Sequence, residues 1–439
     1  MDIKVSVSEK IYDVIVAGGG PSGCAAAVAA ARNGASVLLI EASYCLGGMG
    51  TIGMVPSFAP FTDKEKVISK SIAEEIVVKY KKLMGRADED WDWLPISFEL
   101  LKSVYDEIVT ESGVKVLFGS TVCAVNTENK KIKSVIASAK GGLTEYRAKM
   151  FVDCTGDADI AALCGVPFEC GDNNGNIQAS SLCFIISGVD MSGCDWWDVH
   201  SGPKSIWEKM GDNPKYPLID KNHFVIAKID ENTLGVNAGH LLVENAIDKE
   251  EISEKMILGR KVAAQYLEAA KEYLPDVFKN AFIVSTAPNL GIRESRRIIG
   301  KYVLSIDDYI ARRNFDDEIA RNCYWIDCHR SKDDSVNSAQ SKTVPQLHYD
   351  AGESHGIPWR CLISEKMENL VVAGRTISAD RAVMAAIRVM PVCMTTGEAA
   401  GIGAAIAAME DISIHSLKAS KIRKILKLNG AYIKDCGEL

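Results

Sequence analysis

The segment 12–54 constrains the fold of this chain more than any other part of it. A short apolar run, residues 13–17, predicts a buried strand and leads directly into Gly18, Gly20 and Gly23, which form the pattern GxGxxG. Gly18 allows a tight turn, Gly20 lets the backbone approach a pyrophosphate, and Gly23 lets helix and strand pack closely. The alanine-rich helix that follows offers the free N–H groups of its first turn to that pyrophosphate. The segment therefore predicts a dinucleotide site.

The residues after this helix indicate which dinucleotide the site takes. A second predicted strand, residues 36–40, ends on Glu41, whose carboxylate can accept hydrogen bonds from ribose hydroxyls. Gly47 and Gly48 follow and would bring further backbone N–H groups to the same pyrophosphate. This second glycine pair resembles the FAD site of the glutathione-reductase-like flavoproteins, whereas NAD dehydrogenases usually lack it.

Charge and composition exclude several classes of function. The chain has 50 Lys and Arg against 58 Asp and Glu, a net charge of −8, and no dense basic block, which argues against a general nucleic-acid binder. No apolar run approaches the roughly 18 residues that cross a bilayer. The first ten residues lack the apolar core of a signal peptide. We expect a cytoplasmic protein with no membrane and no nucleic-acid partner.

The cysteine spacing predicts neither a metal site nor a thiol redox pair. The chain has 13 cysteines but no CxxC motif, and the pairs Cys164/Cys170 and Cys323/Cys328 are too loosely spaced for zinc or iron–sulfur ligands. Cys45 stands alone before the second glycine pair, where a disulfide reductase would carry two cysteines. We therefore expect no metal.

The order of predicted elements suggests a cofactor domain that another domain interrupts. The patterns predict helices at 24–33, 64–83, 98–112 and 249–273, and strands at 114–118, 121–126, 131–139 and 144–148. The last three strands form a β-meander. A further strand then runs into a Thr-Gly-Asp turn. Late in the chain a buried strand ends in Gly-Arg, and Pro391 fits the first turn of a helix rich in small residues. We expect a discontinuous cofactor domain (1–62, 98–180 and 365–439), a helical insertion (63–97) and an α+β substrate or cap domain (181–364).

Five segments together carry a family resemblance: LGGMGT, VDCTGDADIA, LGIRESRRIIGKYVL, IPWRCLI and NLVVAGRTISADRAVMAAIRVMPVCMTTGEAAG. They resemble the bacterial FAD-dependent oxidoreductase family, which is related to the glutathione-reductase and fumarate-reductase folds. The resemblance implies an α/β protein with a Rossmann-like FAD-binding domain, built on a central parallel sheet with a β-meander. It also implies bound FAD and redox chemistry, without naming a substrate.

The resemblance also implies which residues contact FAD. Val122 would touch the adenine through its backbone, and the helix that begins near Met390 would point its positive end at the pyrimidine side of the flavin. Thr51 is a candidate for a hydrogen bond to flavin N5 or to substrate. The full set of implied cofactor residues is Gly18, Gly20, Pro21, Ser22, Gly23, Glu41, Ala42, Gly47, Gly48, Met49, Thr51, Val122, Thr155, Gly156, Asp157, Gly374, Arg375, Met390 and Val392.

Several polar residues could lie over the flavin, including His355, Arg375 and Arg388. The candidates for catalysis are Arg293 in GIRESRR, His348 in PQLHYD and Arg360 in IPWRCL. An arginine binds a substrate carboxylate bidentately, and a histidine suits acid–base work. For Arg293 a structural ion pair, for example with Glu294, stays open. For His348 a surface role stays open. Only one dinucleotide fingerprint is present, so an unknown electron donor or acceptor has to use the flavin directly.

These observations favour an FAD-dependent oxidoreductase that transfers a hydride between flavin N5 and a small organic substrate, for which a carboxylate-bearing molecule is one candidate class. Two alternatives stay open at this point. One is a flavin-dependent RNA-modifying enzyme, against which the acidic charge argues. The other is a non-catalytic binding protein on the same fold, against which the complete glycine pattern and Glu41 argue.

Overall fold

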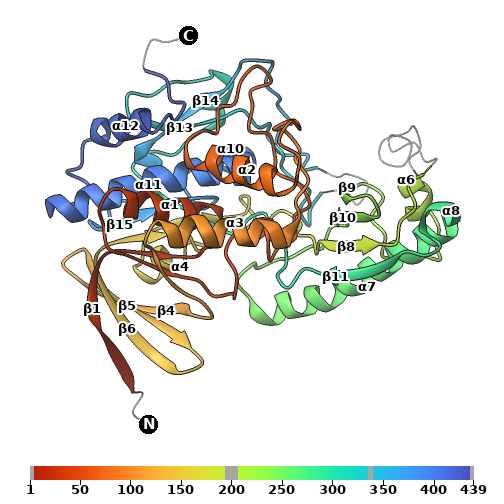
Figure 1. Cartoon of the computed structure of the whole chain (residues 1–439), viewed down its shortest axis with the longest axis horizontal. Helices are drawn as coiled ribbons and strands as arrows, with labels where there is room; N and C mark the ends of the chain where they lie inside the picture. Colours follow the sequence, from red (N-terminus) through yellow and green to blue (C-terminus); the bar gives the residue numbers. More distant parts are fainter. Residues whose placement is uncertain (1–3, 193–205, 335–339, 436–439) are drawn as a thin grey trace.

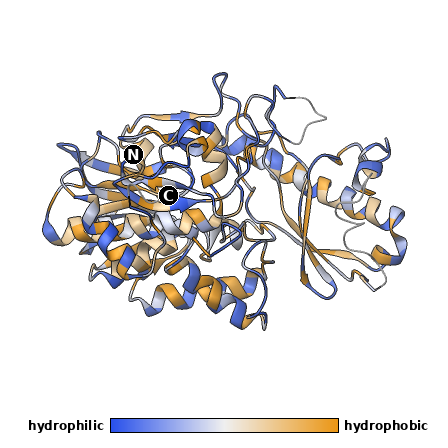
Figure 2. Ribbon diagram, turned by 90° about the horizontal axis from the view of Figure 1, so that it is seen from above, coloured by the Kyte–Doolittle hydropathy of each residue, from blue (hydrophilic) through white to orange (hydrophobic). Residues whose placement is uncertain are grey.

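The computed structural model describes residues 4–192, 206–334 and 340–435. They form a larger lobe around one sheet and a smaller lobe around another, with the long helix α7 lying along the second sheet (Figure 1). Viewed from above, both ends of the chain lie in the larger lobe (Figure 2).

The sheet of the larger lobe has the order β3-β2-β1-β6-β5-β4, and β15 pairs with β6 outside this path. Its strands are β1 (Val5–Ala17), β2 (Val37–Ile40), β3 (Lys115–Leu117), β4 (Thr121–Glu128), β5 (Lys131–Ala139), β6 (Gly142–Asp153) and β15 (Leu370–Val372). β3, β2, β1, β6 and β15 run parallel, whereas β4, β5 and β6 form an antiparallel meander. The predicted fold class is confirmed. β6 joins two predicted strands into one: it pairs with β1 along its length, with β5 at its start and with β15 at its end.

Helices α1 (Pro21–Arg32) and α11 (Met390–Glu410) pack backbone to backbone above this sheet. A Cβ atom on Gly397 would lie 2.1 Å from the Ser22 carbonyl oxygen, and one on Gly401 would lie 2.1 Å from the carbonyl oxygen of Ala26. Only glycine fits at these two positions. The small residues of both helices therefore set how closely they approach, and with it the position of the α1 N-terminus.

The composition of α11 corrects one expectation from the sequence, and its burial explains that composition. By length and composition α11 is apolar enough to cross a membrane, although no such run was expected. Alanine, glycine and isoleucine give it this character, and 83% of its most apolar 18-residue window is buried inside the protein. It is the core helix of the larger lobe.

The helix predicted at 64–83 is shorter than expected. Helix α2 (Ile72–Leu83) does not begin at residue 64, because the Asp63 carboxylate accepts hydrogen bonds from the backbone N–H groups of Glu65 and Lys66 and holds a turn there. Helix α3 (Phe98–Glu111) confirms the predicted one. Both pack beside α1, and α2 also contacts α11.

The smaller lobe is a four-stranded antiparallel sheet of order β11-β8-β10-β9. Its strands are β8 (Phe184–Ser187), β9 (Phe224–Asp230), β10 (Thr233–Ala238) and β11 (Phe282–Thr286); its helices are α6 (Ile206–Gly211), α7 (Lys249–Tyr273) and α8 (Pro275–Phe278). Helix α7 has the predicted bounds. The Asp248 side chain caps it by accepting hydrogen bonds from the N–H groups of Glu250 and Glu251.

Part of the segment expected in the cap domain lies against the larger lobe. β13 (Glu318–Asn322) and β14 (His355–Pro358) form a small sheet beside α11 and α12 (Ala419–Leu428) (Figure 1). β12 (Arg296–Ile298) pairs with β7 (Phe168–Cys170). The second sheet itself spans only residues 184–286. The remaining elements are η1 (Gly48–Gly50), α4 (Asp159–Leu163), α9 (Ile306–Ile310), η2 (Trp359–Leu362) and α10 (Arg381–Ile387).

The contact between α1 and α11 yields a stability prediction. Gly401→Ala should lower the free energy of unfolding by about 1–3 kcal/mol, because the added methyl group overlaps the Ala26 carbonyl oxygen. Urea denaturation measures this. Gly141→Ala is the matched control, since a Cβ there meets no atom within 4 Å. Equal effects of the two substitutions would contradict the packing argument.

Candidate active site

The two glycine loops meet where the sequence predicts a pyrophosphate. The Gly47 N–H donates to the Gly19 carbonyl at 2.8 Å, and a Cβ on Gly48 would lie 2.9 Å from the Gly20 Cα. A Cβ on Gly20, in contrast, meets no atom within 4 Å, so the space beside Gly20 is open. This space adjoins the N-terminus of α1, where no side chain caps the helix. The loops thus leave a cradle that fits a pyrophosphate.

Several N–H groups of this cradle are available to a ligand. In the part of the chain that the structure describes, the N–H groups of Gly48 and Met49 donate to no protein acceptor. Pro21 stands in the first turn of α1, and the buried Ser22 follows it. The Gly47 N–H, in contrast, holds the two loops together and is not free for the ligand.

Glu41 links the second strand to both loops. Its carboxylate accepts hydrogen bonds from the Gly19 and Ser43 N–H groups. A carboxylate has about four lone-pair sites, so ribose hydroxyls can still donate to it. The neighbouring Ala42 is exposed. The residue expected at the adenine, Val122, is buried in β4.

The second turn of the cofactor domain is held by Arg375. Its guanidinium donates to the carbonyl oxygens of Gly156 and Ile292 and to the Asp157 carboxylate, the last at 2.7 Å. The Thr155 hydroxyl donates to the carboxylate at the end of β6. Arg375 therefore ties this turn to the segment that carries the GIRESRR motif.

The expected flavin end of the site is the N-terminus of α11. Met390 and Val392 are buried in its first turn, and the capping residue Val389 offers no side-chain acceptor to the helix N–H groups. Gly374, with φ +85°, lies against Ser22. The hydroxyl of Thr51 donates to the Leu46 carbonyl at 2.6 Å and so stabilises its own loop.

Residues 13–426 match the family described as FAD dependent oxidoreductase. The protein belongs to this family. The cradle between the glycine loops fits its cofactor, FAD, and the open side of Gly20 is the observation that carries this fit. The enzyme is thus an FAD-dependent oxidoreductase, and the alternative of a non-catalytic binding protein falls away.

The oxidoreductase also has distant relatives. It is 26% identical over 162 residues to the protein FixC of Salmonella typhi and 27% identical over 163 residues to FixC of Shigella flexneri; each match covers 34% of this chain and 37% of the relative. The matches thus span just over a third of the length of these relatives.

Solved structures of similar fold share little sequence with the oxidoreductase. A geranylgeranyl bacteriochlorophyll reductase-like protein from Thermoplasma acidophilum is 15% identical, with a TM-score of 0.44, over 97% of this chain and 83% of that one. The p-nitrophenol 4-monooxygenase PnpA from Pseudomonas putida is 12% identical, with a TM-score of 0.45, over 95% of this chain and 83% of that one.

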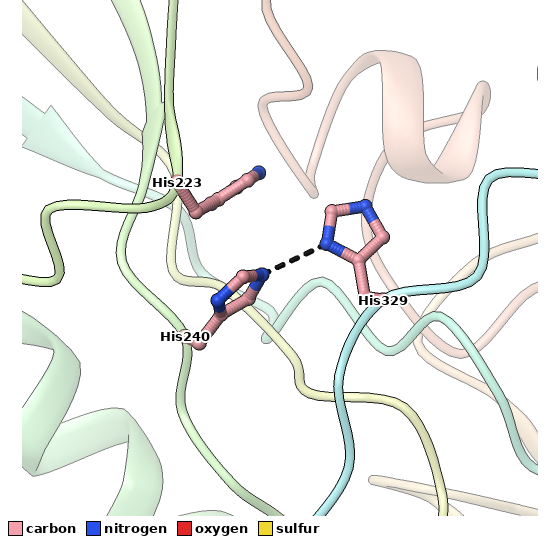
Figure 3. A group of neighbouring side chains, drawn as sticks. All are labelled: His223, His240 and His329. Atoms are coloured by element: carbon pink, nitrogen blue, oxygen red, sulfur yellow. Dashed lines mark hydrogen bonds between the residues drawn. The ribbon is translucent and has the colours of Figure 1, made fainter. Parts of the chain in front are cut away.

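A buried cluster of three histidines and Arg293 lies between the two lobes. His223 precedes β9 and His240 follows β10, so both stand at the open end of one hairpin, and His329 faces them from the loop after β13 (Figure 3). The rings of His223 and His240 are stacked, with centroids 4.5 Å apart. His240 Nε2 lies 2.8 Å from His329 Nδ1, and the Arg293 guanidinium lies 3.3 Å from His223 Nε2.

Oxygen atoms surround the outer edge of this cluster. Asp220 Oδ2 lies 2.8 Å from His240 Nδ1, and the Gly239 carbonyl lies 3.3 Å from Nδ1 of His223. Asp327 Oδ2 lies 3.4 Å from Nε2 of His329. Each ring therefore has an oxygen acceptor on the nitrogen that points away from the other two rings.

Burial controls the charge of the cluster. It lowers the pKa of His223 well below its usual range and the pKa of His329 to about 3. Burial also lowers the pKa of His240, against the opposing effect of Asp220. Burial and repulsion by Arg388 lower the pKa of Arg293 to about 10. At neutral pH the three rings are neutral and Arg293 is charged.

The structure does not bring the other two catalytic candidates to Arg293. His348 is exposed and stacks on Trp325. Arg360 is exposed and forms an ion pair with Asp317 at 2.9 Å. Sequence reasoning missed the three clustered histidines, because they lie 17 and 89 residues apart (240 − 223 and 329 − 240) and no local motif links them.

The cradle yields a prediction that separates cofactor binding from folding. Gly20→Ala should weaken FAD binding at least about tenfold, because its methyl group fills the open space of the cradle, while stability changes by about 1 kcal/mol or less. Fluorescence titration of apoprotein with FAD measures the first and urea denaturation the second. Unchanged FAD affinity would contradict the placement of the pyrophosphate.

A buried histidine outside the cluster yields a pH prediction. Burial and the charge of Arg321 lower the pKa of His355 to about 3, so the folded protein keeps this ring neutral while the unfolded chain protonates it below pH 6.5. The unfolded state then binds more protons, so the free energy of unfolding decreases as the pH is lowered. His355 alone should cost about 2 kcal/mol at pH 5 relative to neutral pH.

Denaturation at the two pH values in wild type and His355→Gln checks this. The variant should lose about 2 kcal/mol less than wild type between neutral pH and pH 5. The exposed His348→Gln is the control and should follow wild type. Identical losses in His355→Gln and wild type would refute the role of burial.

Proposed function

We propose that this oxidoreductase transfers a hydride between flavin N5 and a small organic substrate that carries a carboxylate. The observation that supports this most is the buried Arg293, whose charged guanidinium stands among three neutral histidines. A buried cation requires an anionic partner or a dense set of acceptors. Among the residues that the structure describes, no carboxylate forms an ion pair with Arg293, and only 8% of the residue is exposed.

The hydrogen bonds of Arg293 leave room for a ligand. Its contacts are the Ala179 carbonyl at 2.8 Å, the Ser181 hydroxyl at 3.0 Å and His223 Nε2 at 3.3 Å. They account for at most three of the five N–H groups of a guanidinium. A carboxylate oxygen can accept from the remaining groups.

The charge around the cluster supports an anionic substrate. Arg293, Arg330 and Arg388 carry three positive charges, and Asp220 and Asp327 carry two negative ones, so with neutral histidines the balance is +1. In a partly buried site such an excess attracts an anion more strongly than it would in water. The arginines here are held by carboxylates or backbone acceptors, which fixes their positions.

Two connections support a position of the cluster beside the expected flavin. Arg388 directly precedes the N-terminal cap of α11, and its guanidinium donates to the Asp327 carboxylate, which also faces His329. Ile292, next to Arg293, accepts a hydrogen bond from Arg375, which also holds the second cofactor turn. A substrate bound to Arg293 would therefore lie near the α11 end of the FAD site.

This arrangement assigns separate roles to the cofactor, to Arg293 and to the three histidines. Bound FAD supplies the hydride chemistry at N5. Arg293 binds the substrate carboxylate and fixes the orientation of the carbon that reacts. The neutral imidazoles of the cluster accept or donate a proton at the substrate. Burial of the cluster excludes water from the reacting atoms.

Arg293 yields the prediction that tests this proposal. Reduction of bound FAD is followed anaerobically with a panel of small hydroxy acids and with their methyl esters. Wild type should react with an acid and not with its ester. Arg293→Met should lower kcat/KM for that acid by about 100-fold, since it removes the buried partner of the carboxylate.

Arg312→Met is the matched control and should behave as wild type, because this exposed arginine pairs with Glu353 on the surface. Equal rates with acids and esters would contradict the carboxylate assignment. An unchanged rate in Arg293→Met would contradict the role of Arg293.

A further inference from the structure

The three histidines have a feature that substrate binding does not require: their inner nitrogens point at one another. One nitrogen from each of His223, His240 and His329 lies within 4.8 Å of the other two, and all three residues are buried. Figure 3 shows the rings of the hairpin histidines and of His329 turned toward a shared space.

The outer contacts determine which nitrogens carry hydrogen. Asp220, the Gly239 carbonyl and Asp327 are acceptors only, so the ring nitrogens that face them are N–H groups. His240 Nδ1 also lies 3.3 Å from the Arg330 Nε–H, a donor, but its contact with the Asp220 carboxylate is shorter, at 2.8 Å, and decides the tautomer. In a neutral imidazole the other nitrogen is then a lone pair. The inner nitrogens Nε2 of His223, Nε2 of His240 and Nδ1 of His329 are therefore all electron-pair donors.

This arrangement leaves two lone pairs in direct opposition. His240 Nε2 and His329 Nδ1 are 2.8 Å apart, a distance at which one atom has to donate to the other or both have to share a cation. Neither neutral ring has a hydrogen left for this contact once its outer N–H is used. A cation between the inner nitrogens removes the conflict.

We propose that His223, His240 and His329 bind one divalent first-row transition-metal ion, such as Zn²⁺, with an open fourth position toward Arg293. Three imidazoles with one open position are the ligand set of catalytic zinc sites, and nitrogen ligands suit this group of metals. Metal-bound histidines almost always donate their second N–H to a carboxylate or a backbone carbonyl, which is the arrangement around all three rings.

The distances require only small movements of side chains. Metal–nitrogen bonds of about 2.0–2.1 Å place tetrahedral ligand nitrogens about 3.3 Å apart. The closest pair would open by about 0.5 Å from its 2.8 Å, and the wider pairs would close from within 4.8 Å. Because His223 and His240 are stacked, one of these rings has to tilt.

The charge of Arg293 opposes the metal, and its guanidinium, 3.3 Å from His223 Nε2, has to turn away from this nitrogen when the ion binds. The site contains the means to offset the charge. The carboxylates of Asp220 and Asp327 each contact one ligand ring from outside. An anionic fourth ligand, either hydroxide or a carboxylate, would lie between the ion and the Arg293 guanidinium and be stabilised by both. The metal site goes beyond the proposed function: with the ion bound, the inner nitrogens are ligands and no longer transfer the substrate proton, whereas the roles of Arg293 and the flavin stay the same.

The first test measures metal content and not activity. The FAD-loaded protein, without a histidine tag, is stripped with a chelator, dialysed against Zn²⁺ and analysed by mass spectrometry. Wild type should hold about one Zn²⁺ per chain, with three nitrogen ligands at about 2.0–2.1 Å in X-ray absorption. This spectrum needs no variant, so it remains decisive if a substitution prevents folding.

Variants then assign the ligands. His240→Ala and His329→Ala should lose the ion, and Asp220→Asn should weaken its binding by about 10–100-fold, because an uncharged amide replaces the carboxylate that orients the His240 ring. His348→Gln should keep the ion and controls for binding at surface histidines. Retained FAD absorbance verifies that each variant is folded.

Two results would overturn the proposal. One is the absence of bound metal in wild type after dialysis against Zn²⁺, Co²⁺, Ni²⁺, Mn²⁺ and, without oxygen, Fe²⁺; His240 and His329 would then share a proton. The other is full retention of the ion in the His240→Ala and His329→Ala variants. Neither result bears on the carboxylate specificity assigned to Arg293, so the two proposals fail independently.

Discussion

The contact between the backbones of α1 and α11 is the constraint on which the rest of the site depends. Gly397 and Gly401 let α11 lie against the carbonyl oxygens of Ser22 and Ala26. This contact places two helix N-termini at neighbouring points, one at the pyrophosphate cradle and the other at the expected flavin ring. Both ends lack a side-chain cap, so their N–H groups and positive dipole ends are available to a negatively charged cofactor.

The larger lobe could be predicted from the sequence because its signals are local. The spaced glycines, the meander strands and the buried strand before Gly374 each lie within a short stretch of sequence, and each has a direct physical reason. Helix α7 was predicted with its observed bounds for the same reason. The start of α2 was not, because the turn that delays it is held by the side chain of Asp63, which competes with the helix for backbone N–H groups.

The polar cluster between the lobes could not be predicted, because it is assembled from distant parts of the chain. Arg293 was identified from its motif, but its neighbours are brought to it by the β9–β10 hairpin and by the loop after β13. His348 and Arg360 have the same residue types and are close in sequence to the returning strand, yet they lie on the surface. In this cluster the topology of the chain decides which polar side chains lie together.

The measurement that tests the central claim most directly is a difference absorbance spectrum of the FAD-loaded enzyme during titration with malonate, a small carboxylate that does not donate a hydride. Binding to Arg293 beside the flavin predicts a saturable shift of the visible flavin band, and the neutral malonamide should produce none. A flavin spectrum that is insensitive to malonate, or equally sensitive to both compounds, would contradict an anion site between Arg293 and the flavin.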